Sequence, residues 1–163
     1  DPTKPRLYNW FAVMGIHDTD PNTPNKEFAP EGWHVPTYAE WTTLENHLIA
    51  NGYNYDDTTT ENKIAKAMAS TTGWISSTET GAIGNDQSLN NSSDFNAFPE
   101  GIRFGNQGIS QDFNNEGYNA VFWSSTEDDT NFAVYYAIGY NSLGSAISWT
   151  RKQIGVSVRF VRD

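Results

Sequence analysis

One stretch near residue 36 constrains the fold more than any other, because it combines a proline stop with a helix start. Thr37 and Glu40 stand three apart. This is the spacing of a capping box, in which the threonine hydroxyl and the glutamate carboxylate each accept a backbone N–H at the start of a helix. Pro36 favours extended backbone in the preceding Val35. Residues 32–41 therefore predict the end of a strand, a stop and the first turn of a helix.

The residues after Thr37 have helical periodicity. Trp41, Leu44 and Leu48 recur at i, i+3 and i+7, which places one apolar stripe against a core. Gly52 marks the expected end of this helix. A second, shorter helix is predicted over residues 61–69, with Thr60 as its cap.

The rest of the sequence favours strands and loops. An aromatic run at 6–14 indicates a strand, and residues 102–104 with 109–113 indicate a hairpin. Four further strands are predicted at 121–125, 132–140, 145–149 and 156–161, and their short connections favour antiparallel neighbours. Residues 71–96 are predicted to form a long polar loop, and such loops are usually functional or disordered. The expected fold class is α+β, as a single domain over residues 6–163 after a linker at 1–5.

The composition supports a packed domain and argues against some partners. The 163 residues include six Trp, eight Tyr and nine Phe, which offset a modest aliphatic content. The net charge of -10 repels phosphate backbones and anionic lipid surfaces, so we expect no nucleic-acid partner. No apolar run approaches the ~20 residues of a membrane helix, and we expect no membrane contact by the domain itself.

Three separated motifs resemble those of a known family. They are Gly-Trp-His-Val-Pro-Thr-x-x-Glu-Trp at 32–41, Phe-Trp-Ser-Ser-Thr at 122–126 and Ser-Val-Arg-Phe-Val-Arg-Asp at 157–163. In this order they resemble the Fibrobacter succinogenes major paralogous domain, a family of surface proteins abundant in Bacteroidetes and Fibrobacteres. The resemblance covers nearly the whole chain. Residues 35–41 are more distantly similar to the formylglycine-generating enzyme and C-type lectin-like superfamily.

This resemblance implies a C-type lectin-like fold with two helices, a long loop region and an antiparallel β-sheet. It also implies an extracellular or outer-membrane surface location, as a monomeric part of a longer lipoprotein. The family has no assigned activity. The motif residues are expected to have structural roles, and they are Trp33, His34, Pro36, Thr37, Glu40, Trp41, Trp123 and Arg159.

Buried roles are expected for several aromatic and basic residues. The tryptophans inside the fold-defining segments, Trp10, Trp33, Trp41 and Trp123, are expected in the core. Arg103 and Arg159 lie on predicted strands, and each is expected to pair with Glu40 or Asp94.

No catalytic residue is predicted. The three histidines form no His-Glu-x-x-His motif, and the chain has no Gly-x-Ser-x-Gly elbow. The formylglycine-generating enzymes depend on copper-binding cysteines, and this chain has no cysteine, so that similarity implies shared architecture without shared chemistry. The enzymatic alternative is a glycoside hydrolase that uses paired carboxylates from Asp94, Glu100 or Asp112.

Aromatic residues in or beside the predicted loops are the candidate ligand contacts. Exposed aromatic rings can stack on sugar rings while amide and carboxylate groups bond the hydroxyls. The candidates are Trp74, Tyr118, Tyr140 and Trp149. The alternative is that these rings close the core of an aliphatic-poor domain.

Calcium is the one cofactor for which the sequence offers candidate ligands. Asp86, Asn90 and Asp94 cluster in the long loop and carry the oxygen ligands that calcium prefers. However, Asx-rich loops usually form self-bonded turns, and the Glu-Pro-Asn and Gln-Pro-Asp triplets of calcium-dependent sugar lectins are absent. No cofactor is therefore assigned, and calcium remains a candidate.

The function expected from these observations is a non-catalytic cell-surface binding or adhesion domain. Its loop face would recognise a glycan or an extracellular protein. Two alternatives remain open, the glycoside hydrolase named above and a structural module that assembles surface proteins.

Overall fold

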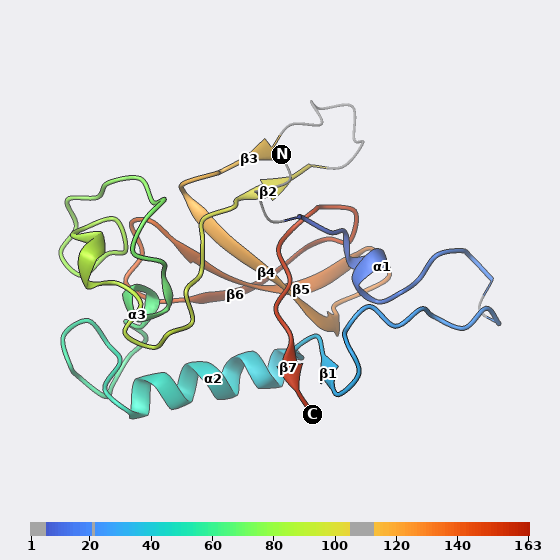
Figure 1. Ribbon diagram of the computed structural model, residues 1–163, viewed down its shortest axis with the longest axis horizontal. Coiled ribbons are helices and arrows are strands. Elements are labelled where there is room, and N and C mark those ends of the chain that lie inside the picture. Colours follow the sequence, from blue (N-terminus) through green and yellow to red (C-terminus); the bar gives the residue numbers. More distant parts are fainter. Residues whose placement is uncertain (1–5, 21, 105–112) are drawn as a thin grey trace.

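The computed structural model describes residues 6–20, 22–104 and 113–163. Figure 1 shows an antiparallel sheet with α2 along one side and a group of loops at one end. In chain order the elements are α1 (Trp10–Val13), β1 (Trp33–His34), α2 (Tyr38–Ala50), α3 (Ala65–Met68), the 3-10 helix η1 (Gln87–Leu89), β2 (Ile102–Arg103), β3 (Phe113–Asn114), β4 (Asn119–Glu127), β5 (Phe132–Gly139), β6 (Ala146–Arg151) and β7 (Val161–Arg162).

The central sheet has the order β4-β5-β6, and both pairs of strands are antiparallel. Val121 of β4 lies opposite Ala137 of β5, and Tyr135 of β5 lies opposite Ser148 of β6. The register shifts between Trp123 and Glu127, which marks a bulge near the end of β4. The strands predicted at 121–125, 132–140 and 145–149 are therefore confirmed.

Both faces of this sheet are buried, because successive side chains of a strand point to opposite sides. The core on the α2 side includes Trp41, Leu48, Met68, Phe122, Tyr136 and Ile138. The core on the α1 side includes Trp10, Val13, Val121, Trp123, Ala133 and Val156. At the centre of the first core the Trp41 ring stacks on the Tyr136 ring, with centroids 4.5 Å apart and an interplanar angle of 6°. Aromatic residues thus take part in both cores, as the composition predicts.

Helix α2 confirms the capping signature. The Thr37 hydroxyl accepts the Glu40 N–H at 3.2 Å, and the Glu40 carboxylate accepts the Thr37 N–H at 2.8 Å. Trp41 and Leu48 are buried, and Leu44 packs partly against the same core. The helix ends at Ala50, and Gly52 follows with a φ of 77°, a conformation that costs glycine little.

The N-terminal aromatic run does not form the predicted strand. Trp10–Val13 is a short helix, because the side chain of Asn9 accepts the Ala12 N–H and caps it. Only Tyr8 makes a strand-like contact, a bridge to Val156. The prediction of a strand over 6–14 is wrong, since a local cap overrides the β preference of the aromatic residues.

Two further predicted elements are shorter than expected. The helix predicted at 61–69 is present only at Ala65–Met68, and Glu61 has a φ of 61°, which a helix cannot contain. The strand predicted at 156–161 is replaced by isolated bridges of Val156 and Ser157, and a regular strand begins only at Val161. These bridges go to Tyr8 and Phe122, so the C-terminal segment contacts several elements in turn.

Two small sheets complete the fold. β1 pairs with β7, and β2 pairs with β3 as the predicted hairpin requires, although the turn at 105–112 lies outside the described residues. The few helices and the antiparallel sheets confirm the α+β class. In the described part of the chain no helix has the length and apolar character needed to cross a membrane.

Candidate functional site

Two of the four predicted ligand contacts, Tyr118 and Tyr140, lie against each other at one end of the sheet. Their ring centroids are 5.2 Å apart and their planes meet at 85°. The N–H of Tyr140 donates to the carbonyl of Tyr118 at 2.8 Å, which continues the pairing of β4 with β5 beyond Gly139. Tyr118 is 44% exposed and Tyr140 is half-buried, so the pair presents an aromatic surface to solvent.

Hydrogen-bonding groups lie beside this pair. A Cβ atom on Gly139 would stand 3.0 Å from the Ser142 hydroxyl oxygen and 3.1 Å from the Asn119 amide oxygen. Both side chains are half-buried, and no hydrogen bond to another described residue uses either one. Ile75, which is exposed, donates its N–H to Gly117 at 2.9 Å and lies on the neighbouring loop. We call this group the tyrosine platform, made of Ile75, Tyr118, Asn119, Tyr140 and Ser142.

The other two predicted contacts are not part of the platform. Trp149 is 60% exposed on the edge strand β6, opposite Val134. Val134 is six residues before Tyr140 along the chain, and at about 3.3 Å per residue this places Trp149 about 20 Å from the platform. Trp74 is buried, and its indole N–H donates to the Ser70 hydroxyl at 3.1 Å. The prediction for Trp74 is therefore wrong, because this ring closes the core under the long loop.

The predicted calcium ligands do not converge on one point. Lys66 of α3, which is 7% exposed, donates from its ammonium to the Asp86 carbonyl at 2.9 Å and to the Asn90 amide oxygen at 3.0 Å. It also bonds the carbonyls of Ala82 and Asn85. Burial lowers the pKa of Lys66. The Asn90 amide oxygen thus accepts from an ammonium, and Asp86 contributes its main-chain carbonyl to the same group while its carboxylate accepts from Ser88.

Asp94, the third predicted calcium ligand, lies elsewhere and lines a groove beside α2. Within the described residues no group of three or more His, Cys, Asp or Glu side chains has a metal-binding arrangement. Lys66 itself is a residue that sequence reasoning missed. A lysine between alanines in an apolar segment was a signal for a buried ammonium.

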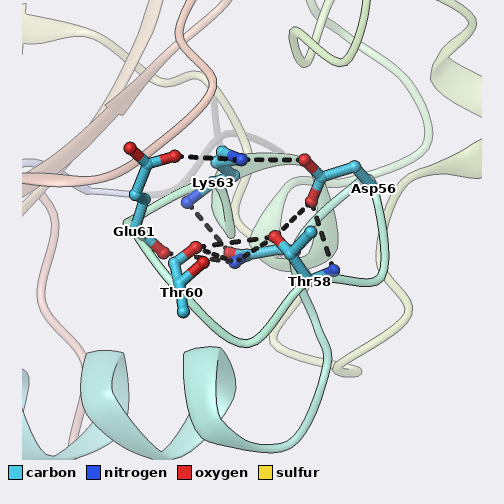
Figure 2. Close-up of polar contacts among 6 residues, drawn as sticks. Asp56, Thr58, Thr60, Glu61 and Lys63 are labelled. Carbon is cyan, nitrogen blue, oxygen red and sulfur yellow. Dashed lines mark hydrogen bonds and ion pairs between the residues drawn. The ribbon is translucent and has the colours of Figure 1, made fainter.

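A charged cluster lies in the loop after α2, and Figure 2 shows that its groups bond one another. The Lys63 ammonium lies 2.8 Å from Asp56 and 3.1 Å from Glu61. The hydrogen bond from Lys63 lowers the pKa of Asp56 to about 2. Asn54, which is buried, donates to the carbonyls of Thr60 and Glu61. This loop therefore satisfies its own charges and has a structural role.

Comparison with known proteins identifies the family. The sequence model of the Fibrobacter succinogenes major domain family matches residues 2–162 of the chain. The chain belongs to this family. No curated protein and no solved structure matches it significantly.

The first family motif of this Fibrobacter succinogenes major domain contains a histidine, His34, that is bonded on both sides. Nδ1 of His34 lies 2.6 Å from Asp163, and Nε2 lies 2.7 Å from Glu40. Because ionised carboxylates only accept hydrogen bonds, the imidazolium form of His34, with hydrogen on both ring nitrogens, satisfies both partners. The bonds to Asp163 and Glu40 raise the pKa of His34, and the Thr37 N–H lowers the pKa of Glu40. In that imidazolium form neither ring nitrogen has a lone pair for base catalysis.

Trp33 of the same motif differs from its predicted core position. It is 45% exposed, and it lines a cavity of about 470 Å³ together with His34 and the loop around Phe28. Val35 and Pro36, which follow β1, are buried, so the chain enters the core only after the strand. The predictions for Trp10, Trp41 and Trp123 are confirmed, since all three are buried.

The two arginines do not form the predicted ion pairs. Arg159 of the third family motif donates from Nη2 to the carbonyls of Phe95 and Asn96, at 2.9 and 3.0 Å. Its guanidinium lies 4.8 Å from the Phe95 ring centroid. Arg103 lies 5.9 Å from the ring of Phe113. Of the two expected acceptors, Glu40 is engaged by His34, and Asp94 is exposed and, within the described residues, forms an ion pair with neither arginine, so the pairing prediction is wrong.

Proposed function

We propose that this domain is a non-catalytic cell-surface domain that binds carbohydrate at the tyrosine platform. One observation carries the proposal, the contact between Tyr118 and Tyr140 beside hydrogen-bonding groups that no described residue uses. Tyrosine rings offer an apolar face to a sugar ring and a hydroxyl to its substituents. The Asn119 amide and the Ser142 hydroxyl supply both donors and acceptors next to the rings.

The shape of the platform suits an extended ligand better than a small enclosed one. Tyr118 and Ile75 are both exposed, at 44% and 42%. An open surface of this kind would contact one or two sugar units of a chain and leave the rest in solvent. This supports binding to a polysaccharide with modest affinity for each domain, which a longer surface protein would increase by avidity.

The proposal includes the finer fold class and location. We infer a C-type lectin-like arrangement, in which an antiparallel sheet holds an extensive loop region at one end, and display outside the cell as part of a longer lipoprotein. The loops that contain α3 and η1 gather at one end of the central sheet, which is consistent with that arrangement (Figure 1).

Several features weigh against the glycoside hydrolase alternative. A general acid of such an enzyme needs a raised carboxyl pKa, whereas hydrogen bonds lower the pKa of Asp20, Glu40 and Asp56. Of the three candidate carboxylates, Asp94 lines the groove beside α2, Glu100 is half-buried outside the lining of that groove, and Asp112 lies outside the described residues. We therefore favour binding without bond cleavage.

A glycan array with plant and host polysaccharide fragments, followed by titration calorimetry on each hit, tests the function. We expect binding that Tyr118→Ala and Tyr140→Ala each weaken at least tenfold. Trp149→Ala is the matched control, because it removes an exposed aromatic ring far from the platform. If no polysaccharide fragment on the array and no matrix protein binds at millimolar concentration, a structural assembly module is the better interpretation.

A further inference from the structure

A groove beside α2 has no role in the proposed carbohydrate binding. It has a volume of about 560 Å³, within the range of small-molecule sites. Its apolar walls are Trp41, Leu44, Phe95, Phe160 and Val161. These come from α2, from the end of the long loop and from the C-terminal segment, so the groove lies where three parts of the chain meet. We call it the α2 groove.

The α2 groove contains a cation without a carboxylate partner. Arg159 lines it, and its guanidinium packs on Phe95 and Phe122 with centroid distances of 4.8 and 5.7 Å. Nη2 is used by two backbone carbonyls, while Nε and Nη1 have no acceptor among the described residues. Burial lowers the pKa of this guanidinium. A desolvated charge in this state is costly, and an anion in the groove would reduce that cost.

The same wall contains a second unused donor. Trp41 is 2% exposed, and its indole Nε1 is the one buried side-chain nitrogen or oxygen in the described residues that has no hydrogen-bond partner. Buried donors are normally paired, and each unpaired one costs about 1–3 kcal/mol. Two residues that line the groove, Arg159 and Trp41, therefore carry donors without acceptors among the described residues, and Nε1 of Trp41 is closed off from solvent.

The other charged side chains of the groove limit what can bind. The Glu40 carboxylate already accepts from Thr37 and His34. Asp94 is exposed, and so is His47. The Arg159 guanidinium would repel a cationic ligand. A ligand with a single carboxylate can pair with that guanidinium and pack its apolar part along the walls of the groove.

We propose that the α2 groove binds an apolar monocarboxylate, whose carboxylate pairs with Nε and Nη1 of Arg159. Arginine presents two parallel N–H donors that match a carboxylate, so the pairing is directional. The apolar part of the ligand packs on Leu44, Phe160 and Val161. This site is independent of the tyrosine platform, and its test does not depend on carbohydrate binding.

Titration of the protein with decanoate, followed by proton–nitrogen NMR, tests the site, and decanol is the matched neutral probe. We expect saturable shifts of the Trp41 indole N–H and the Leu44 amide with decanoate, and at least tenfold weaker binding of decanol. Arg159→Gln should weaken decanoate binding at least tenfold and leave decanol binding unchanged. Equal affinity of the two probes for the wild-type protein would overturn the assignment of Arg159.

A second variant keeps the test decisive if Arg159→Gln fails to fold. Thr43 is exposed and lines the groove, so Thr43→Trp fills it without removing a core contact. Asn46→Trp adds the same ring to an exposed position of the same helix outside the groove. We expect Thr43→Trp to abolish decanoate binding and Asn46→Trp to retain it. Undiminished binding by Thr43→Trp would place the ligand elsewhere and refute the proposal.

Discussion

The Nδ1 atom of His34 lies 2.6 Å from Oδ1 of Asp163, which joins β1 to the end of the C-terminal segment. The opposite nitrogen of the same ring bonds Glu40 in the first turn of α2. One imidazolium therefore connects three segments that are far apart in the sequence. Its charge, and with it the connection, depends on pH.

We expect the stability of the protein to fall as pH rises from about neutral. The two bonds raise the pKa of His34 above 6.5 in the folded state, so its contribution is complete below pH 6.5 and is lost as pH rises through the folded pKa. The loss should be about 1 kcal/mol, because both pairs are partly exposed and water screens them. Urea unfolding at a series of pH values measures it.

The control for this prediction is another histidine. His34→Gln should remove the decline in stability over that pH window, whereas His47→Gln should retain it, because the His47 ring bonds only Asn51 among the described residues. A decline of unchanged size in His34→Gln would show that another group titrates.

Thr37→Ala should destabilise the protein by about 1 kcal/mol, as loss of an N-cap usually does. The change removes the acceptor for the Glu40 N–H and the hydroxyl that bonds the Glu40 carboxylate. Thr43→Ala on the exposed side of α2 is the control, and it should change stability by less than about 0.5 kcal/mol. Equal effects of the two substitutions in urea unfolding would contradict a capping role.

The sequence predicted correctly those features that depend on residues close together along the chain. The capping box needs only Thr37 and Glu40, three apart, and the strands β4 and β5 follow from alternation over eight or nine residues. The N-terminal helix was predicted as a strand because its aromatic residues favour strands. The cap from Asn9 was a readable signal that the composition of the run concealed.

The candidate site was only partly predictable, because it depends on contacts between distant residues. Tyr118 and Tyr140 were predicted as separate contacts, and their meeting follows from the register of β4 and β5. Burial of Trp74 depends on Ser70 and the core below it, which no local pattern reveals. Lys66 reaches the Asn90 amide oxygen from 24 residues away, so the local cluster of Asx residues did not indicate that an ammonium bonds it.

Lys66→Met should destabilise the protein by about 3 kcal/mol, the cost of leaving a buried set of acceptors without their cation. The carbonyls of Asn85 and Asp86 would lose their donor, and the loop that contains η1 would open. Hydrogen exchange should therefore increase at the amides of residues 82–91 more than in the central sheet. Lys63→Met, which removes a partly exposed ammonium, should leave those amides protected. Unchanged protection in Lys66→Met would show that the loop is held by other contacts.

Trp74 and Trp149, the two predicted ligand contacts that are not part of the tyrosine platform, should differ strongly in how much stability the protein loses when each is replaced by alanine. Trp74 is 5% exposed and packs in the α2-side core, so Trp74→Ala should cost about 3–5 kcal/mol. Trp149 is 60% exposed on an edge strand, and Trp149→Ala should change stability by less than about 0.5 kcal/mol. Paired urea titrations, with Trp74→Phe as an intermediate, measure the difference. A large loss in Trp149→Ala would mean that its ring packs against neighbours more closely than its exposure indicates, and a small loss in Trp74→Ala would contradict its place in the core.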